Sequence, residues 1–307
     1  MLEKDKSHFH NMPDIASEPA LHSNGQLESV GMSGIEVPVS IIDSQGKLMR
    51  IPALAEASVN LHDEGARGIH MSRLFKLVQE AFSQKILNLE LLSEVSLEFL
   101  NSHQGLSNQA NLSVSFSAML ERKALKSSNT GWRSYPVSLS VHREADQAPR
   151  YFVEVLVTYA STCPASAALS RQLIQNHFAA DFSEAKADTR EVFEWLGSST
   201  GIVATPHAQR SYAKVKVQVK NPNFEFLSLI DLIEEVLQTP VQTAVKREDE
   251  QEFALRNGQN LMFCEDAARR VQSALLKQPE LVEYEGEFRH VESLHPHDAV
   301  AKIRGSV

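Results

Sequence analysis

The chain has 307 residues, of which 42% are hydrophobic and 22% are charged, a composition that can bury a substantial core and excludes a disordered chain. Its formal net charge of -9 argues against a protein that coats DNA or RNA, although a nucleotide could still bind in a locally basic pocket. The N-terminal residues contain no apolar signal segment and no apolar run approaches a membrane-spanning length, so we expect a cytoplasmic protein with no membrane partner.

The first half of the chain predicts a polar arm followed by alternating strands and helices. Residues 1–33 are polar and lack a sustained hydrophobic period, which predicts a mobile N-terminal arm. Apolar residues then recur with the period of a strand, of a helix and again of a strand. The pattern predicts two strands, two helices and two strands, at residues 34–43, 58–63, 72–82, 86–100, 111–120 and 135–142.

The second half repeats this order with insertions. The clearest strand covers residues 151–160 and runs into a helix at 161–178, with Ser161 or Thr162 expected near its cap and Pro164 in its first turn. Further strands are predicted at 211–220 and in 281–303, and further helices at 188–198, 224–237 and 260–276. Helices beside an antiparallel sheet in both halves predict an α+β class. Neither a GxGxxG nor a GxxxxGK[ST] motif occurs.

Thiol, imidazole and carboxylate side chains gather at the ends of these elements. They are Cys163 in "TCPAS", His207 in "TPHAQRS", Glu250 in "KREDE", and His295 with His297 in "ESLHPHD". Such a set can hold a divalent first-row metal, and a site with fewer than four protein ligands keeps a position for water. The spacing matches no short metal motif, so each residue also has a structural interpretation.

Those interpretations are ordinary ones. Cys163 could be a buried thiol, although the start of a helix lowers a thiol's pKa and favours thiolate. His207 could be a loop histidine, and Glu250 lies in a charge run that is most often a solvated helix face. His295 and His297 are expected on the same side of an extended segment, because Pro296 disfavours helical geometry for the residue before it.

Two other segments could contact a nucleotide. Glu265 in "FCEDAARR" either pairs with Arg269 on a helix surface or accepts two N–H donors from a guanine edge, and the adjacent Cys264 is expected to pack. Arg67, His70 and Arg73 in "GARGIHMSRL" lie at a predicted helix start. They are either scattered surface charges or a phosphate site, because helix N-termini favour anions.

Six motifs, in this order, resemble those of the type IB GTP cyclohydrolases: "GARGIHMSRL", "TCPASAALS", "TPHAQRS", "VQTAVKREDEQEFA", "FCEDAARR" and "ESLHPHDAVA". The "MPDIASE" segment near the N-terminus extends the resemblance over nearly the whole chain. The resemblance implies a tunnelling fold (T-fold) with two tandem modules of antiparallel sheet and paired helices, at 34–146 and 147–307. It implies that the second module carries most of the metal-site residues and a helical insertion around 170–200, and that the protein is a homotetramer with sites at subunit interfaces.

The resemblance also implies an activity, which is the metal-dependent opening of GTP to 7,8-dihydroneopterin triphosphate and formate. This reaction begins the synthesis of folate and of queuosine-type deazaguanines. By motif, Cys163, His207, Glu250 and His295 would surround zinc, manganese or Fe(II), and Cys163 would also be catalytic. Glu265 would anchor the guanine, and Glu292 and His297 would stand close to the reacting atoms. We expect Arg67, His70 and Arg73 to hold the triphosphate.

The chain departs from the family pattern in two places, and two other functions stay open. Ala165 stands where many members have a second cysteine, in "CPAS" instead of "CPCS", and the gap from Cys163 to His207 is long. One alternative is a related tunnelling-fold enzyme that acts on another purine or pterin. The other is a non-catalytic metal- or nucleotide-binding assembly protein in which the same residues form a closed structural site.

Overall fold

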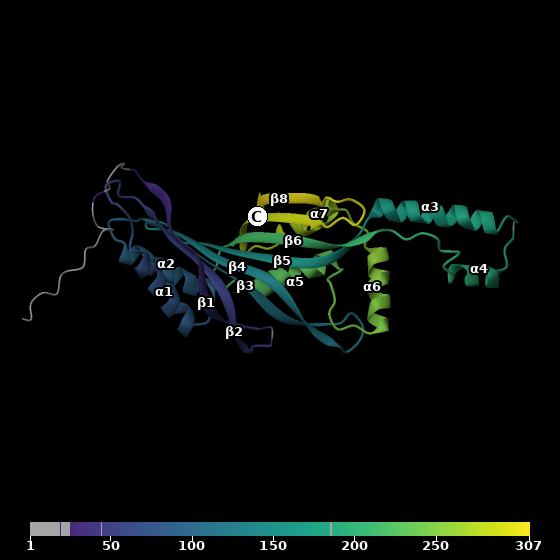
Figure 1. Cartoon of the computed structure of the whole chain (residues 1–307), viewed down its shortest axis with the longest axis horizontal. Coiled ribbons are helices and arrows are strands. Elements are labelled where there is room, and N and C mark those ends of the chain that lie inside the picture. Colours follow the sequence, from purple (N-terminus) through teal and green to yellow (C-terminus); the bar gives the residue numbers. More distant parts are fainter. Residues whose placement is uncertain (1–18, 20–24, 44, 185) are drawn as a thin grey trace, which may run out of the picture. The chain divides into compact units, whose positions relative to one another are not determined.

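The computed structural model describes residues 19, 25–43, 45–184 and 186–307. Its strands are β1 (Leu27–Ile42), β2 (Leu48–Leu61), β3 (Gln109–Lys123), β4 (Thr130–Glu144), β5 (Arg150–Thr162), β6 (Ala208–Val219), β7 (Leu281–His290) and β8 (Ala299–Ser306). Its helices are α1 (Met71–Gln84), α2 (Leu89–Ser102), α3 (Pro164–Asp181), α4 (Thr189–Leu196), α5 (Phe226–Leu237), α6 (Arg247–Gln259) and α7 (Cys264–Leu275), as Figure 1 shows. The strands follow one another in chain order in one sheet, and the pairings from β5 to β8 are antiparallel. The predicted α+β class is confirmed.

The described chain forms two compact units. The first contains the described residues of 1–40, 52–114 and 140–150, and the second those of 41–51, 115–139 and 151–307. Residues 41–51 and 115–139 belong to the second unit, so the two units have other bounds than the predicted modules at 34–146 and 147–307. The division into two such modules stays a prediction. Among the helices that the structure describes, none combines the length and the apolar character needed to cross a bilayer.

In the first unit, α1 and α2 pack together through apolar stripes. Leu74, Val78 and Phe82 recur every four residues along α1 and are buried. Helix α2 begins at an Asn88 cap, whose side chain accepts a hydrogen bond from Leu91 N at 2.7 Å. The spacing of apolar residues therefore predicted both helices correctly.

Strand β1 begins earlier than the sequence indicates. Most of the predicted mobile arm at 1–33 lies outside the described residues, but Leu27 already belongs to β1, and the stretch read as a connection before residue 58 belongs to β2. At Gly31 the two strands approach so closely that a Cβ would lie 2.0 Å from Ala57 O. Much of this part of β1 is exposed, so its ladder forms through backbone hydrogen bonds without the alternation that predicts a strand.

In the second unit, the sheet is covered by the apolar faces of α5 and α7. Val153, Val155 and Val157 alternate with less buried residues along β5 and are at most 1% exposed. Leu229, Ile230, Ile233 and Leu237 form the buried stripe of α5, and Ala267, Val271 and Leu275 form that of α7. This packing gives β5, β6 and β7 one dry face, on which the side chains near the strand ends are held rigidly.

Helices α3 and α4 occupy the segment in which the sequence predicts a helical insertion. Figure 1 shows them extending beyond the ends of β5 and β6. Only Ala167 and Ser170 are buried on α3, and no residue of α4 is buried. The excursion has an aromatic cluster of its own, in which the ring centroids of Phe178 and Trp195 lie 5.3 Å apart.

Candidate active site

The ends of β5 and β6 place Cys163 beside His207. Thr162 and Ala208 are paired residues of the two strands, and Cys163 N donates a hydrogen bond to His207 O at 3.3 Å. His207 N in turn donates to Ser166 Oγ at 3.1 Å. The long insertion therefore leaves the sheet and returns to it at neighbouring positions, so it does not separate the two side chains.

Cys163 caps helix α3. Its Sγ accepts a hydrogen bond from Ser166 N at 3.5 Å, and Pro164 follows in the first turn. The expected caps, Ser161 and Thr162, belong instead to the last residues of β5, because the strand continues up to the helix. The Cys163 sulfur therefore faces the amide end of α3, where the backbone N–H groups of the first turn point.

A cavity of about 560 Å³ opens at this end of the second unit. Six of the predicted site residues line it: Cys163, His207, Glu265, Glu292, His295 and His297. Further lining residues that the sequence analysis did not assign to a site include Gln209, Phe263, Cys264 and His290. Side chains from β6, α7, the N-terminus of α3 and the loop after β7 thus meet around one hollow.

The histidine pair lies on the loop that joins β7 to β8. The rings of His295 and His297 stack with centroids 5.0 Å apart and an interplanar angle of 12°. Arg289 and Asp298, near the two ends of this loop, form an ion pair at 3.2 Å. Glu292 Oε2 lies 4.0 Å from His207 Nδ1, so the loop also brings a carboxylate to the metal-capable histidine.

Glu265 lies in the first turn of α7, and its carboxylate does not pair with Arg269. Arg269 pairs with Asp266 at 3.3 Å instead of with Glu265. Cys264 Sγ donates a hydrogen bond to Glu265 Oε2 at 3.3 Å. Burial and the neighbouring Glu265 raise the pKa of the Cys264 thiol to about 11, so the thiol keeps its proton and acts as the donor. Cys264 therefore orients Glu265 as well as packing.

Glu250 does not line the cavity. It is exposed on the first turn of α6, as the structural interpretation of the charge run predicts. Throughout the residues that the structure describes, no group of three or more histidine, cysteine or acidic side chains stands close enough together to hold a metal. Cys163, His207 and His295 share the cavity without meeting at one point.

Asp249, next to Glu250, is the buried member of that charge run. Its Oδ1 accepts hydrogen bonds from Lys126 N at 2.7 Å and Ser127 N at 2.8 Å, and its Oδ2 accepts one from Lys246 N at 2.8 Å. Burial raises the pKa of Asp249, but the hydrogen bonds from Ser127, Lys246 and Lys126 outweigh it and hold the pKa well below its ordinary value. Asp249 therefore fixes the start of α6 against the β3–β4 loop.

The three residues predicted to hold phosphate belong to the first unit. His70 immediately precedes α1 and its ring lies 6.3 Å from that of the buried His103, measured between centroids. Arg73, in the first turn of α1, donates a hydrogen bond to Ser102 O. Neither they nor Arg67 are among the residues that line the cavity, and their role in binding triphosphate stays a prediction.

A buried histidine stands behind the cavity. His290 is 2% exposed, and its ring nitrogens lie 2.9 Å from Tyr159 Oη and 3.1 Å from Ser161 Oγ. Burial lowers the pKa of His290 to about 4, against the opposing effect of the Glu265 and Asp266 charges. The imidazole is therefore neutral in the folded protein at neutral pH.

This burial predicts an acid-sensitive stability. The unfolded chain binds a proton at His290 below a pKa of about 6.5, whereas the folded protein resists that proton down to about 4, so stability falls as pH falls through this window. We expect the free energy of unfolding to be about 2 kcal/mol lower at pH 5 than at pH 7 because of His290. Urea unfolding of chelator-treated protein at both pH values measures this, and His290→Gln should have the shallower pH dependence. Equal dependence in both proteins would contradict the prediction.

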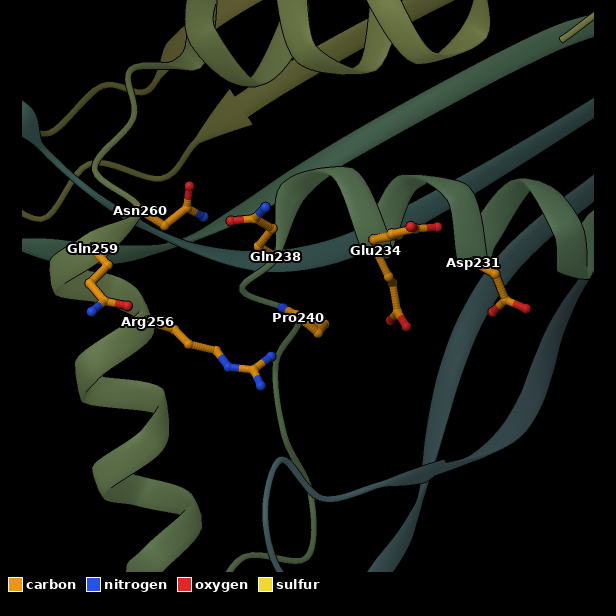
Figure 2. A pocket seen from close by; sticks show the side chains of 8 residues that line it. Asp231, Glu234, Gln238, Pro240, Arg256, Gln259 and Asn260 are labelled. Atoms are coloured by element: carbon orange, nitrogen blue, oxygen red, sulfur yellow. The ribbon is translucent and has the colours of Figure 1, made fainter. Parts of the chain in front are cut away.

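A second cavity, of about 550 Å³, lies between α5 and α6. In Figure 2 the acidic side chains of α5 stand on one side and Arg256 and Gln259 of α6 on the other. Two of its charged residues have protein partners: Glu234 Oε1 accepts hydrogen bonds from Arg133 Nη1 at 2.9 Å and Tyr135 Oη at 2.5 Å, and Arg256 pairs with Glu252 at 2.8 Å. These ion pairs stabilise the fold, and the cavity contains none of the predicted site residues.

Comparisons with known proteins agree with the motifs. Residues 12–301 match the family model described as type I GTP cyclohydrolase folE2. A GTP cyclohydrolase FolE2 of Bdellovibrio bacteriovorus is 56% identical over 294 residues, which cover 95% of this chain and 96% of that protein. A GTP cyclohydrolase FolE2 of Pseudoalteromonas translucida is 50% identical over 293 residues, which cover 94% of this chain and 96% of that protein.

Among solved structures, the uricase from Arthrobacter globiformis has a similar fold. The two structures superpose with a TM-score of 0.55 at 8% sequence identity, covering 92% of this chain and 94% of the uricase. Identity this low indicates a shared fold and carries no information on the reaction. The family is established by the sequence matches: over nearly its whole length, the chain belongs to the type I GTP cyclohydrolase FolE2 family.

Proposed function

We propose that the cavity around Cys163, His207 and Glu265 is the site at which this GTP cyclohydrolase of folate biosynthesis opens the guanine ring of GTP, giving 7,8-dihydroneopterin triphosphate and formate. Family membership supports the enzyme class and the substrate. The observation that carries the location is the meeting of six motif residues around one hollow of about 560 Å³. Pockets of this size accommodate a small-molecule ligand.

We assign the metal site to Cys163, His207 and His295, with Glu250 as the fourth ligand predicted from the motifs. A thiolate and two imidazoles suit zinc, and manganese or Fe(II) compete according to supply and geometry. Three of the four donors line the same cavity, and His295 stands on an irregular loop that can adjust its position. A divalent ion bound there would supply water of lowered pKa, which ring opening at C8 requires at neutral pH.

The remaining cavity residues have roles that follow from their chemistry. Glu265 accepts the N–H donors of the guanine edge and holds the base in register. His297 and Glu292 move protons to and from the ring nitrogens, because imidazole and carboxylate side chains are common general acids and bases in enzymes. Of the two stacked rings, His295 thus binds the metal and His297 transfers protons to and from the substrate.

The assembly and the triphosphate site belong to the same proposal. We propose tandem tunnelling-fold modules in a homotetramer, with Arg67, His70 and Arg73 of a neighbouring subunit binding the triphosphate. Guanidinium groups suit this role because they pair with phosphate oxygens bidentately. The cytoplasmic location, expected from the sequence, stays a prediction.

The test is turnover of GTP by purified protein loaded with zinc, manganese or Fe(II). We expect release of formate together with the fluorescence of the oxidised pterin product. Absence of turnover with all three metals, in a folded oligomer, would overturn the assignment. Turnover of a dihydroneopterin derivative or of another purine in place of GTP would favour the related enzyme. GTP that is bound and recovered unchanged would favour the non-catalytic assembly protein.

A further inference from the structure

A row of polar side chains crosses the dry face of β5, β6 and β7 directly behind the cavity. Strand register places Ser161 opposite Gln209, and Ser211 opposite both Tyr159 and His290. All five side chains are at most 9% exposed. Burying polar groups is unfavourable unless they are hydrogen-bonded, so their partners decide what this row does.

The row forms one connected chain of hydrogen bonds that reaches the cavity at His207. Gln209 Oε1 lies 2.9 Å from His207 Nδ1, and Gln209 Nε2 donates to Ser161 Oγ at 2.9 Å. Ser161 Oγ lies 2.8 Å from Ser211 Oγ and 3.1 Å from His290 Nδ1, and His290 Nε2 lies 2.9 Å from Tyr159 Oη. Both ends of the Gln209 amide are therefore engaged, one towards the cavity and one towards the core.

The geometry at His207 restricts which nitrogen can bind a metal. Nδ1 is already occupied by the Gln209 carbonyl oxygen, which can only accept a hydrogen bond, so Nδ1 carries the proton. Nε2 is then the nitrogen with a lone pair, the form in which histidine binds metals. A rotation of Gln209 that presented its N–H to His207 would turn its carbonyl oxygen to Ser161 Oγ. Ser161 would then have to donate its single hydroxyl hydrogen to Gln209 and could no longer donate it to Ser211 or His290.

We infer that Gln209 is a positioning residue that holds His207 as the Nδ1–H tautomer with Nε2 available in the cavity, and that Ser161, His290 and Tyr159 keep the Gln209 amide in this orientation. The inference rests on the proposed function in one respect, the assignment of His207 to the metal. Gln209 lies within the "TPHAQRS" motif, but the sequence assigned a role there only to His207, because a glutamine next to a strand start is an ordinary polar residue.

The experiment measures Zn²⁺ affinity by competition with a chromophoric chelator and the His207 tautomer by nitrogen NMR of histidine-labelled, metal-free protein. Gln209→Met keeps the side-chain length and removes both hydrogen bonds. We expect about 10- to 100-fold weaker Zn²⁺ binding, the usual loss when a partner of a metal-binding histidine is removed, and a His207 signal that is no longer purely Nδ1–H. Gln209→Glu, which keeps an acceptor oxygen, should restore most of the affinity and the tautomer.

Gln218→Met is the matched control, because Gln218 lies on the same strand towards its far end and does not line the cavity. It should leave Zn²⁺ affinity and the His207 tautomer unchanged. Equal Zn²⁺ binding by Gln209→Met and the parent protein, or an Nε2–H tautomer in the parent protein, would overturn the inference and leave the GTP reaction standing. If His207→Ala binds Zn²⁺ as tightly as the parent, the metal assignment itself fails. If Gln209→Met does not fold, the inference is tested by the tautomer of His207 in the parent protein and by the Zn²⁺ affinity of Gln209→Glu. An Nδ1–H tautomer and a near-parental affinity would support it.

Discussion

Cys163→Ala is expected to abolish formate release from GTP while the protein keeps its fold. Cys163 is the one thiol at the N-terminus of α3, and the neighbouring Ala165, where the family resemblance led us to expect a second cysteine, also lines the cavity. No adjacent sulfur can therefore replace it. Removing only an outer partner of a metal ligand costs about 10- to 100-fold, so we expect the loss of the ligand itself to exceed about 100-fold in activity and in Zn²⁺ affinity.

The matched control for the Zn²⁺ affinity in this prediction is Cys264→Ala, the other cysteine of the chain. Cys264 retains its proton because burial raises its pKa to about 11, and a protonated thiol is a poor metal ligand. We therefore expect Cys264→Ala to bind Zn²⁺ as the parent does. Circular dichroism and thermal unfolding establish that both variants fold. A near-parental rate for Cys163→Ala would remove Cys163 from the site.

Glu265→Ala is expected to lower kcat/KM for GTP and to erase the preference for a guanine base. Two hydrogen bonds to a charged carboxylate contribute about 3–6 kcal/mol, which corresponds to roughly 10²–10⁴ in kcat/KM. The effect should appear as a change in selectivity, because inosine triphosphate lacks the exocyclic amino group that donates to the carboxylate. The measurement is the ratio of kcat/KM for GTP to that for inosine triphosphate.

In the parent protein this ratio should be large, and in Glu265→Ala it should approach one. Glu283→Gln, an exposed carboxylate of β7 away from the cavity, is the matched control and should leave the ratio unchanged. Loss of activity towards both nucleotides with the ratio preserved would mean that Glu265 supports the reaction without reading the base. Cys264→Ala should reduce the ratio modestly, because its thiol orients the carboxylate.

The helices and strands that could be predicted from the sequence are those in which apolar residues recur with a clear period. The valines of β5 and the apolar stripe of α5 indicated elements whose buried faces match the structure. Cys163, His207, Glu265 and His295 could be selected because ordered motifs carry them, and they do line one cavity. The position of His207 relative to Cys163 could not be predicted, because many residues separate the two in the sequence. The pairing of β5 with β6 brings them together, and local sequence patterns do not reveal such a pairing.

The residues that were missed depend on partners far away in the chain. Asp249 lies within a charge run typical of a solvated helix face, and only the amides of the β3–β4 loop make it a buried residue. Gln209 and His290 carried a weak signal. Each occupies a position in phase with buried apolar neighbours, such as Ala213 on β6 and Phe288 on β7, where a polar side chain needs a partner.

The return of the chain to its starting point after α3 and α4 has a consequence for how the family can vary. Since Cys163 N and His207 O are hydrogen-bonded, the excursion is a closed loop whose ends are fixed by the β5–β6 ladder. The entropy of closing a flexible loop grows only logarithmically with its length, by about 0.6 kcal/mol for each doubling. We therefore expect a change in the length of the chain between Cys163 and His207 to cost little free energy. The distance between the two side chains is set by the β5–β6 pairing and does not depend on how many residues separate them in the sequence.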